Sequence, residues 1–315
     1  MTKGARDRRW PRGLLAASLW LVRSVLPAQD YTWWNEANDW DGVTHWSRYI
    51  NFSPYHLGPN GLPVPMLATG TIDTTARLMV GGELHFSEGD DTQALQTRLS
   101  LPFAGDRVAL QLEWMPLEHF AMDTVTRDER HARDRDGEGY STGDVHLSTL
   151  VQVLRERDDR PGLMLRIRLK TASGGNLEAA RHTDAPGYSF DLSTGRWFTG
   201  SGQLQRWRVQ AMAGFLVYQT NRTDYYQNDC LLYGAGAVAD LGDWTVEGTV
   251  AGYMGYLDRR DRPMVLRASV GTDRPHGTEH RLMFQGPLKD WTYTTISYTL
   301  GLRLGGRVFG TDRER

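Results

Sequence analysis

The chain has 315 residues and is close to electrical neutrality, with 36 Lys+Arg against 38 Asp+Glu and a formal net charge of -2. Its mean hydropathy of -0.50 excludes a polytopic helical membrane protein, because no window supplies the about 20 mostly apolar residues that each helical span needs. A transmembrane β-barrel is compatible, since its strands alternate apolar and polar residues. The one cysteine, Cys230, excludes an internal disulfide framework and a cysteine-based zinc site.

The first 28 residues are typical of a cleaved export signal. Residues 1–12 carry five basic side chains, residues 13–22 are an apolar run, and Ala28 offers a cleavage point before Gln29. The alternative is a short membrane-anchoring helix, although the apolar run is too short to span a bilayer. Removing six basic residues and one acidic residue leaves 30 basic against 37 acidic, a net charge of -7. That charge disfavours nucleic-acid binding, which requires a basic face.

Residues 29–75 form an aromatic-rich segment without lasting periodicity, which closes in a Pro/Gly-rich stretch at 54–65. Aromatic rings gain free energy when they are buried. We therefore expect the segment to pack on or in the following domain as a plug or periplasmic girdle. The alternative is an aromatic platform that stacks sugars or other flat groups. The candidate side chains for either role are Trp33, Trp34, Trp40 and Trp46.

From residue 76 onward the sequence alternates in the manner of β-strands. Within 163–171, for example, four aliphatic side chains alternate with Met164, Arg166, Arg168 and Lys170. Many segments exceed the usual strand length of about 5–6 residues and suit a tilted bilayer crossing of about 9–11. The expected strands are 76–88, 91–104, 106–122, 143–156, 161–173, 186–194, 203–219, 228–241, 243–257, 262–272, 277–287 and 290–304.

Loop lengths give an independent test, because outer-membrane barrels have short periplasmic turns and longer extracellular loops. If the N-terminus is periplasmic, connections after odd-numbered strands face outward. The longest connections, 123–142 and 174–185, lie on that side, together with 220–227. Connections after even-numbered strands are mostly tight, and 195–202 is the exception. We predict an all-β fold, a single antiparallel transmembrane barrel of about 12 strands over 76–304, which leaves no edge strand.

Two further segments carry separate expectations. The densely charged stretch 123–142 is expected to be a solvated loop, with binding of a divalent cation or lipopolysaccharide headgroup as the alternative. Residues 305–315 are expected to be a C-terminal tail. The tail departs from the usual outer-membrane pattern, in which an aromatic residue completes the last strand, because Phe309 is followed by six more residues.

The sequence GDVHLSTLVQVL from Gly143, followed by LRIRLKTASGGNLEAARHTDAPGYSFDLSTG ending at Gly195, resembles a known family. The family comprises outer-membrane barrels of a transporter group associated with phenol meta-pathway degradation. There a strand beginning with Gly-Asp is followed by a Leu-Lys-Thr-x-Ser-Gly turn and a similar return strand. The resemblance covers residues 143–195 and implies a 12-strand-type outer-membrane channel or uptake protein. It carries over no catalytic residues.

Charged residues at inward-facing strand positions are the candidates for lining a pore. In a filled barrel they would pair across the lumen, because unpaired buried charge is costly. In an open barrel they would set the charge selectivity of a polar channel. With the aromatic segment available as a plug, we favour a partly blocked, charged lumen. The candidates are Arg166, Arg168, Lys170, Arg206, Arg208, Glu83, Glu113, Asp191 and Glu247.

No pattern indicates catalysis, a metal or a cofactor. His146 and Ser148 share a strand face, and that face is expected to point to the lumen. A lipid hydrolase needs its Ser/His pair near the outer rim on the bilayer side, with an acid orienting the His. His276 and His280 flank a turn and lack an HExxH pattern. No phosphate-binding glycine loop is present. The sequence thus predicts no catalytic residues, no metal and no cofactor.

Taken together, these features predict an exported protein of a Gram-negative cell outer membrane, with its signal cleaved near Ala28. The expected partners are outer-membrane lipid and lipopolysaccharide, and no nucleic acid. The expected function is a channel or uptake protein for small solutes. The alternatives are a non-transporting barrel that serves as an anchor or binding surface, and an outer-membrane lipid hydrolase.

Overall fold

The structure, a computed structural model, describes residues 30–257, 260–272 and 278–304. The chain divides into two compact units between Asp39 and Trp40. The described part of the first unit contains the short helix α1 (Thr32–Ala37), whose Trp34 carbonyl accepts a hydrogen bond of 2.9 Å from the side chain of Asn38. No helix in the described part of the chain is long and apolar enough to cross a membrane. The expected export signal and Phe309 lie outside the described residues.

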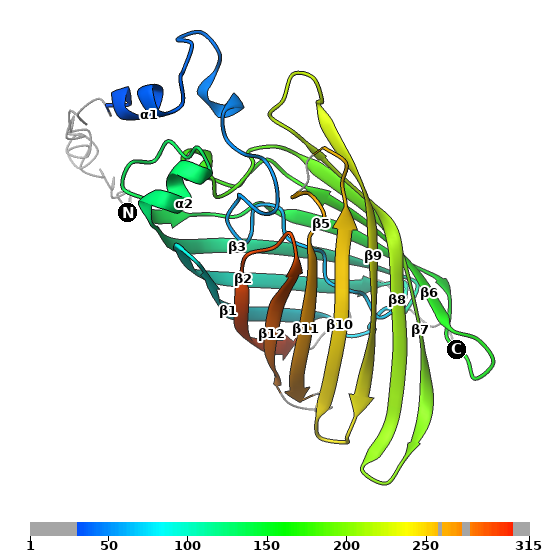
Figure 1. Cartoon of the computed structure of the whole chain (residues 1–315). Helices are drawn as coiled ribbons and strands as arrows, with labels where there is room; N and C mark the ends of the chain where they lie inside the picture. Colours follow the sequence, from blue (N-terminus) through cyan, green and yellow to red (C-terminus); the bar gives the residue numbers. More distant parts are fainter. Residues whose placement is uncertain (1–29, 258–259, 273–277, 305–315) are drawn as a thin grey trace, which may run out of the picture. The chain divides into compact units, whose positions relative to one another are not determined.

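The second unit is built from strands joined by turns and loops (Figure 1). Its elements are η1 (Trp46–Arg48), β1 (Arg77–Ser87), β2 (Asp90–Phe103), β3 (Val108–Met122), α2 (Thr124–Glu129), β4 (Glu138–Ser141), β5 (His146–Leu154), β6 (Gly162–Lys170), η2 (Leu177–Ala179), β7 (Gly187–Ser201), β8 (Leu204–Gln219), β9 (Gln227–Asp240), β10 (Thr245–Met254), β11 (Met264–Thr272), β12 (Glu279–Lys289) and β13 (Thr294–Arg303).

The sheet is antiparallel throughout and closes on itself. Each long strand pairs with its neighbours in sequence, and β1 pairs with β13 in a register that places Leu84 opposite Ile296. The short strand β4 pairs only with the end of β3, placing Gly139 opposite Phe120, and lies outside the closed ring. The predicted barrel of about 12 strands is confirmed, with one extra strand in a loop.

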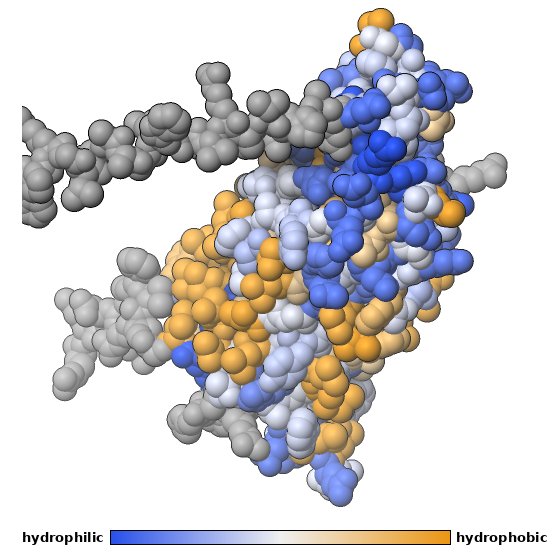
Figure 2. All heavy atoms as spheres, turned by 90° about the vertical axis from the view of Figure 1, so that its left-hand side faces the viewer, coloured by the Kyte–Doolittle hydropathy of each residue, from blue (hydrophilic) through white to orange (hydrophobic). Residues whose placement is uncertain are grey.

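The two faces of the wall differ because side chains alternate along each strand. In β6, Leu169 is 51% exposed on the outer face, whereas Arg166 is only 7% exposed on the inner face. In β13, Ile296 is 44% exposed and its neighbour Ser297 is 2% exposed. Figure 2 shows one flank of the barrel, with hydrophobic residues spread in orange areas over the wall. The outer face therefore has the apolar character that a bilayer requires.

Loop length separates the two ends of the barrel. The end that we call the long-loop end carries 123–145, 171–186 and 220–226, and the opposite, short-turn end carries 104–107, 155–161, 202–203 and 241–244. The prediction of a long connection at 195–202 is wrong, because β7 continues to Ser201 and leaves only Gly202 and Gln203 before β8. The loop-length rule therefore holds better than the sequence indicated.

The charged stretch 123–142 is more ordered than expected. It contains α2, whose first turn is capped by the side chain of Asp123, and it contains β4. Arg130 and Ala132 are 3% and 1% exposed, respectively. The expectation of a solvated loop is wrong for these two residues, because the loop folds back over the barrel end.

Candidate functional site: the barrel lumen

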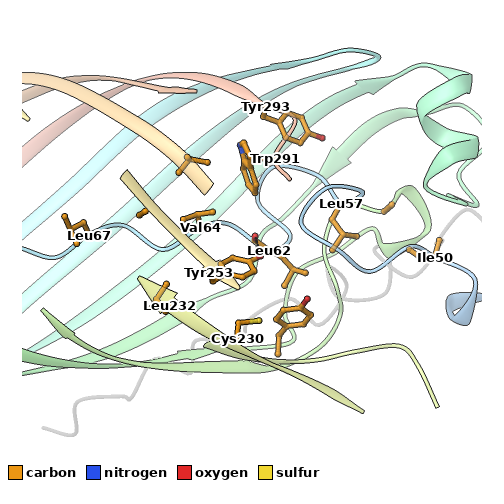
Figure 3. Packing of buried hydrophobic residues seen from close by; sticks show 14 of the residues in the cluster. Ile50, Leu57, Leu62, Val64, Leu67, Cys230, Leu232, Tyr253, Trp291 and Tyr293 are labelled. Atoms are coloured by element: carbon orange, nitrogen blue, oxygen red, sulfur yellow. Dashed lines mark hydrogen bonds between the residues drawn. The ribbon is translucent and has the colours of Figure 1, made fainter. Parts of the chain in front are cut away.

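A non-strand segment, residues 57–72, runs through the inside of the barrel, and we call it the lumen segment. Figure 3 shows Leu62, Val64 and Leu67 of this segment between the strands. Its backbone carbonyls accept hydrogen bonds from side chains of five different strands, which can converge on one chain only inside the closed sheet. The bonds run from Tyr253 of β10 to Leu62 (2.9 Å), from Arg267 of β11 to Val64 (2.6 Å) and Pro65 (3.2 Å), from Arg166 of β6 to Met66 (3.0 Å), from Arg208 of β8 to Thr69 (2.6 Å), and from Gln152 of β5 to Gly70 (2.8 Å).

Apolar packing also holds the lumen segment. Leu57, Leu62 and Val64 are at most 5% exposed and belong to one hydrophobic cluster with Leu232 of β9 and Tyr253 of β10. Figure 3 shows these side chains between the translucent strands. Full burial of an aliphatic side chain is worth about 1.5–3 kcal/mol. The lumen segment is therefore anchored both by its carbonyls and by its side chains.

A buried ionic network covers the long-loop end, and we call it the cap. Arg181, from the loop 171–186, donates to Glu118 of β3 (2.8 Å) and to Asp90 of β2 (2.6 Å). Arg130 and Tyr293 each donate to the same Asp90 oxygen at 2.6 Å. None of the five side chains is more than 4% exposed. Burial alone would lower the pKa of Arg181, but the carboxylates of Glu118 and Asp90 raise it above its ordinary value.

His182 lies fully buried beside the cap. Neither ring nitrogen has a hydrogen-bond partner among the described residues. Burial lowers the pKa of His182 below its ordinary value, against the opposing attraction of the Glu118 and Asp144 carboxylates. Asp144 in turn forms an ion pair with Lys170 at 2.7 Å. Burial therefore disfavours the charged form of this imidazole, although carboxylates lie near it.

A cavity of about 710 Å³ extends along the lumen segment. At one extreme it reaches Gln205 and Gly242, which lie at the short-turn end. Towards the long-loop end it reaches Asn60 and Trp291, below the cap. The sequence-predicted candidates that line it are Glu83, Glu113, Arg166, Arg168, Arg206, Arg208 and Glu247.

Most charges around the cavity are paired. Glu113 binds Arg168 and Arg98, each at 2.7 Å. The other pairs that involve the sequence-predicted residues are Arg166 with Asp191 (2.7 Å), Arg208 with Glu156 (2.6 Å), Arg206 with Asp240 (2.6 Å), Glu247 with Arg281 (2.9 Å) and Lys170 with Asp144 (2.7 Å). Glu83 accepts a hydrogen bond from the Gln96 amide (2.8 Å) and lies 3.3 Å from the His85 imidazole. The structure thus brings these residues to one charged interior, and their role in lining a conducting pathway stays a prediction.

Sequence reasoning missed Arg267, whose side chain is 5% exposed in the lumen. Its guanidinium donates to Gln285 (2.7 Å) and to the lumen segment. Among the described residues no carboxylate lies within ion-pair distance of it. Alternation within 262–272 places Arg267 on the inner face and could have identified it, whereas no sequence pattern indicates its carbonyl partners.

The predicted aromatic residues lie N-terminal to the lumen segment, which itself contains no aromatic side chain. Trp40 is half-buried and its indole N–H donates to the Thr44 carbonyl (2.7 Å). The Arg133 guanidinium lies 5.4 Å from the ring centroid of Trp46. Trp33 and Trp34 belong to α1 in the first unit. The segment inside the barrel is therefore not aromatic-rich. The alternative role of the tryptophans, an aromatic platform, stays a prediction.

The candidate catalytic pair does face the interior, as the alternation predicts. His146 lines the cavity, and Ser148, which is 3% exposed, has no hydrogen-bond partner for its hydroxyl among the described residues. His276 lies outside the described residues, and His280 contacts Thr278 and Tyr298. Within the described ranges, no three His, Cys, Asp or Glu side chains are grouped so that they could hold a metal ion.

No protein-family model and no curated protein matches this chain. Solved structures do match. An outer-membrane channel from Pseudomonas putida F1 is similar with a TM-score of 0.53 and 10% identity, over 76% of this chain and 98% of that one. This chain has the fold of an outer-membrane β-barrel. The NanC porin matches with a TM-score of 0.48 and 8% identity, over 72% and 100% of the two chains. The narrower resemblance to the phenol meta-pathway group stays a prediction.

Proposed function

We propose that this protein is an outer-membrane channel or uptake protein for small solutes, with a lumen that its own residues 57–72 partly block. The observation that carries the proposal is the charged cavity of about 710 Å³, which lies inside a closed barrel and reaches the short-turn end. Ion pairs along the wall provide a polar path, and such side chains set the charge selectivity of pores. The apolar outer face supports a location in the outer membrane.

The lumen segment and the cap favour a second candidate, a barrel that does not transport. Both features are anchored by buried charges and cover the cavity towards the long-loop end. In that case the barrel serves as an anchor or a binding surface. The inward positions of His146 and Ser148 do not favour the third candidate, a lipid hydrolase, which needs its catalytic pair at the bilayer-facing rim.

Single-channel conductance in planar bilayers separates the first two candidates. We expect small openings from the full chain and larger ones from a variant that lacks residues 29–67, because the deletion removes the carbonyls that Arg267 and Tyr253 hold. The migration of unheated samples on denaturing gels checks that both barrels are folded. A folded deletion variant that stays silent in the bilayer would refute the channel.

A further inference from the structure

The route of the chain into the barrel has a topological consequence. Residues 46–58 are bound to three loops of the long-loop end. Asn221 of the loop 220–226 donates to the carbonyls of Ser47 (2.6 Å) and Ile50 (2.8 Å). Asn51 donates to the carbonyl of Glu129 at the end of α2 (2.8 Å), and the Gly58 amide donates to the carbonyl of Ala180 in the loop 171–186 (2.9 Å). The chain therefore enters the barrel from this end.

The contacts of the lumen segment then descend in order along the barrel. Asn60 meets Glu118 near the long-loop end of β3, and Met66 meets Arg166 in the middle of β6. Gly70 meets Gln152 near the short-turn end of β5. Asp73 then forms an ion pair (2.7 Å) with Arg77, the first residue of β1. The segment makes one complete crossing and does not turn back.

The length of the segment fits a full crossing. Sixteen residues, 57–72, can extend to about 53–58 Å at most. The hydrocarbon core of a bilayer is about 30 Å thick. Residues 58–61 form a turn, in which the Gly61 amide donates to the Gly58 carbonyl (3.0 Å). Residues 63–69 after it contain no helix or turn, which suits the prolines at positions 63 and 65.

We propose that residues 40–56 are displayed at the cell surface, on the opposite side of the outer membrane from the start of β1. The inference rests on the proposed outer-membrane location, with the long loops facing outward. It replaces the predicted periplasmic girdle with an outer one, in which residues 40–56 pack on the loops of the long-loop end. Val43, whose side chain is 88% exposed, lies in the solvent-facing part of residues 40–56.

Cysteine accessibility in intact cells tests the display. The native Cys230 is fully buried, so the parent chain should stay unlabelled by a membrane-impermeant maleimide. Val43→Cys is the test variant. Tyr226→Cys, at an exposed position of the loop 220–226, is the matched control for the long-loop end. Asp159→Cys, at an exposed position of 155–161, is the control for the short-turn end.

We expect Val43→Cys and Tyr226→Cys to be labelled equally before and after the outer membrane is permeabilised. Asp159→Cys should be labelled only afterwards. If Val43→Cys follows Asp159→Cys, the crossing is wrong. If neither Val43→Cys nor Tyr226→Cys reacts in intact cells, the surface location is refuted together with the assumed orientation. Channel function does not enter this readout, because it is measured separately as conductance.

Discussion

Replacing Arg181 tests whether the cap is held by buried charge. Arg181→Gln would remove the cation that binds Glu118 and Asp90 at 2.8 Å and 2.6 Å. Asp90 would keep Arg130 and Tyr293, but among the described residues Glu118 would keep only the hydrogen bond from the Asn60 amide, at 2.9 Å. Breaking a buried ion pair by removing one partner costs about 3–5 kcal/mol, because the other charge is left uncompensated. We expect the free energy of unfolding to fall by that amount.

Guanidinium unfolding of the barrel in detergent micelles measures this loss. The matched control is Arg222→Gln, whose ion pair with Asp224 has side chains that are 49% and 55% exposed. Exposed pairs contribute about 0–1 kcal/mol, so the control should barely change stability. The double variant Arg181→Gln/Glu118→Gln should recover part of the loss, since it removes the orphaned carboxylate as well. Equal effects of Arg181→Gln and Arg222→Gln would refute the argument from burial.

Three further predictions concern the lumen segment, the bilayer face and pH. Gly70→Ala should lower the free energy of unfolding by about 2–4 kcal/mol, because Gly70 has φ +81° and a Cβ there would lie 2.8 Å from the backbone of β7. Gly82→Ala is the control in the same unfolding assay and should be tolerated, since a Cβ there would meet open space. Phe190→Arg on the outer face should cost about 2–4 kcal/mol in vesicles, and Tyr226→Arg in a loop much less; equal costs would exclude a bilayer there. Because burial lowers the pKa of His182, the unfolded chain binds more protons below about pH 6.5, so stability should fall as the pH drops through that value. His182→Asn should flatten this slope, and an unchanged slope would assign it to other groups.

The faces of the strands could be predicted from local sequence. Leu163, Leu165 and Ile167 lie on the outer face of β6, and Arg166 and Arg168 on its inner face, because alternation is a property of the extended backbone itself. The end of β7 was missed for a related reason. In 195–201, Trp197 faces the cavity and Phe198 stacks with Trp207, so both faces carry aromatic rings and the apolar alternation is lost.

The cap could not be predicted from sequence. Arg181 binds partners that are 63 and 91 residues away along the chain. Nothing in the loop 171–186 distinguishes a buried arginine from a solvated one, because its environment is created only when β2, β3 and that loop meet at the long-loop end. The same holds for Arg130 within a stretch whose composition favours solvent.

The sequence by itself determined a two-faced barrel wall, its inward charges and its unequal ends, because strand alternation and loop length are local properties. Only the tertiary structure decided which residues fill the lumen inside that wall. The lumen segment is held by bonds such as Arg267 to Val64, which join residues 203 apart and use backbone carbonyls that every residue possesses. A bond to a carbonyl leaves no mark in side-chain composition, so only the closed barrel shows which part of the chain crosses it.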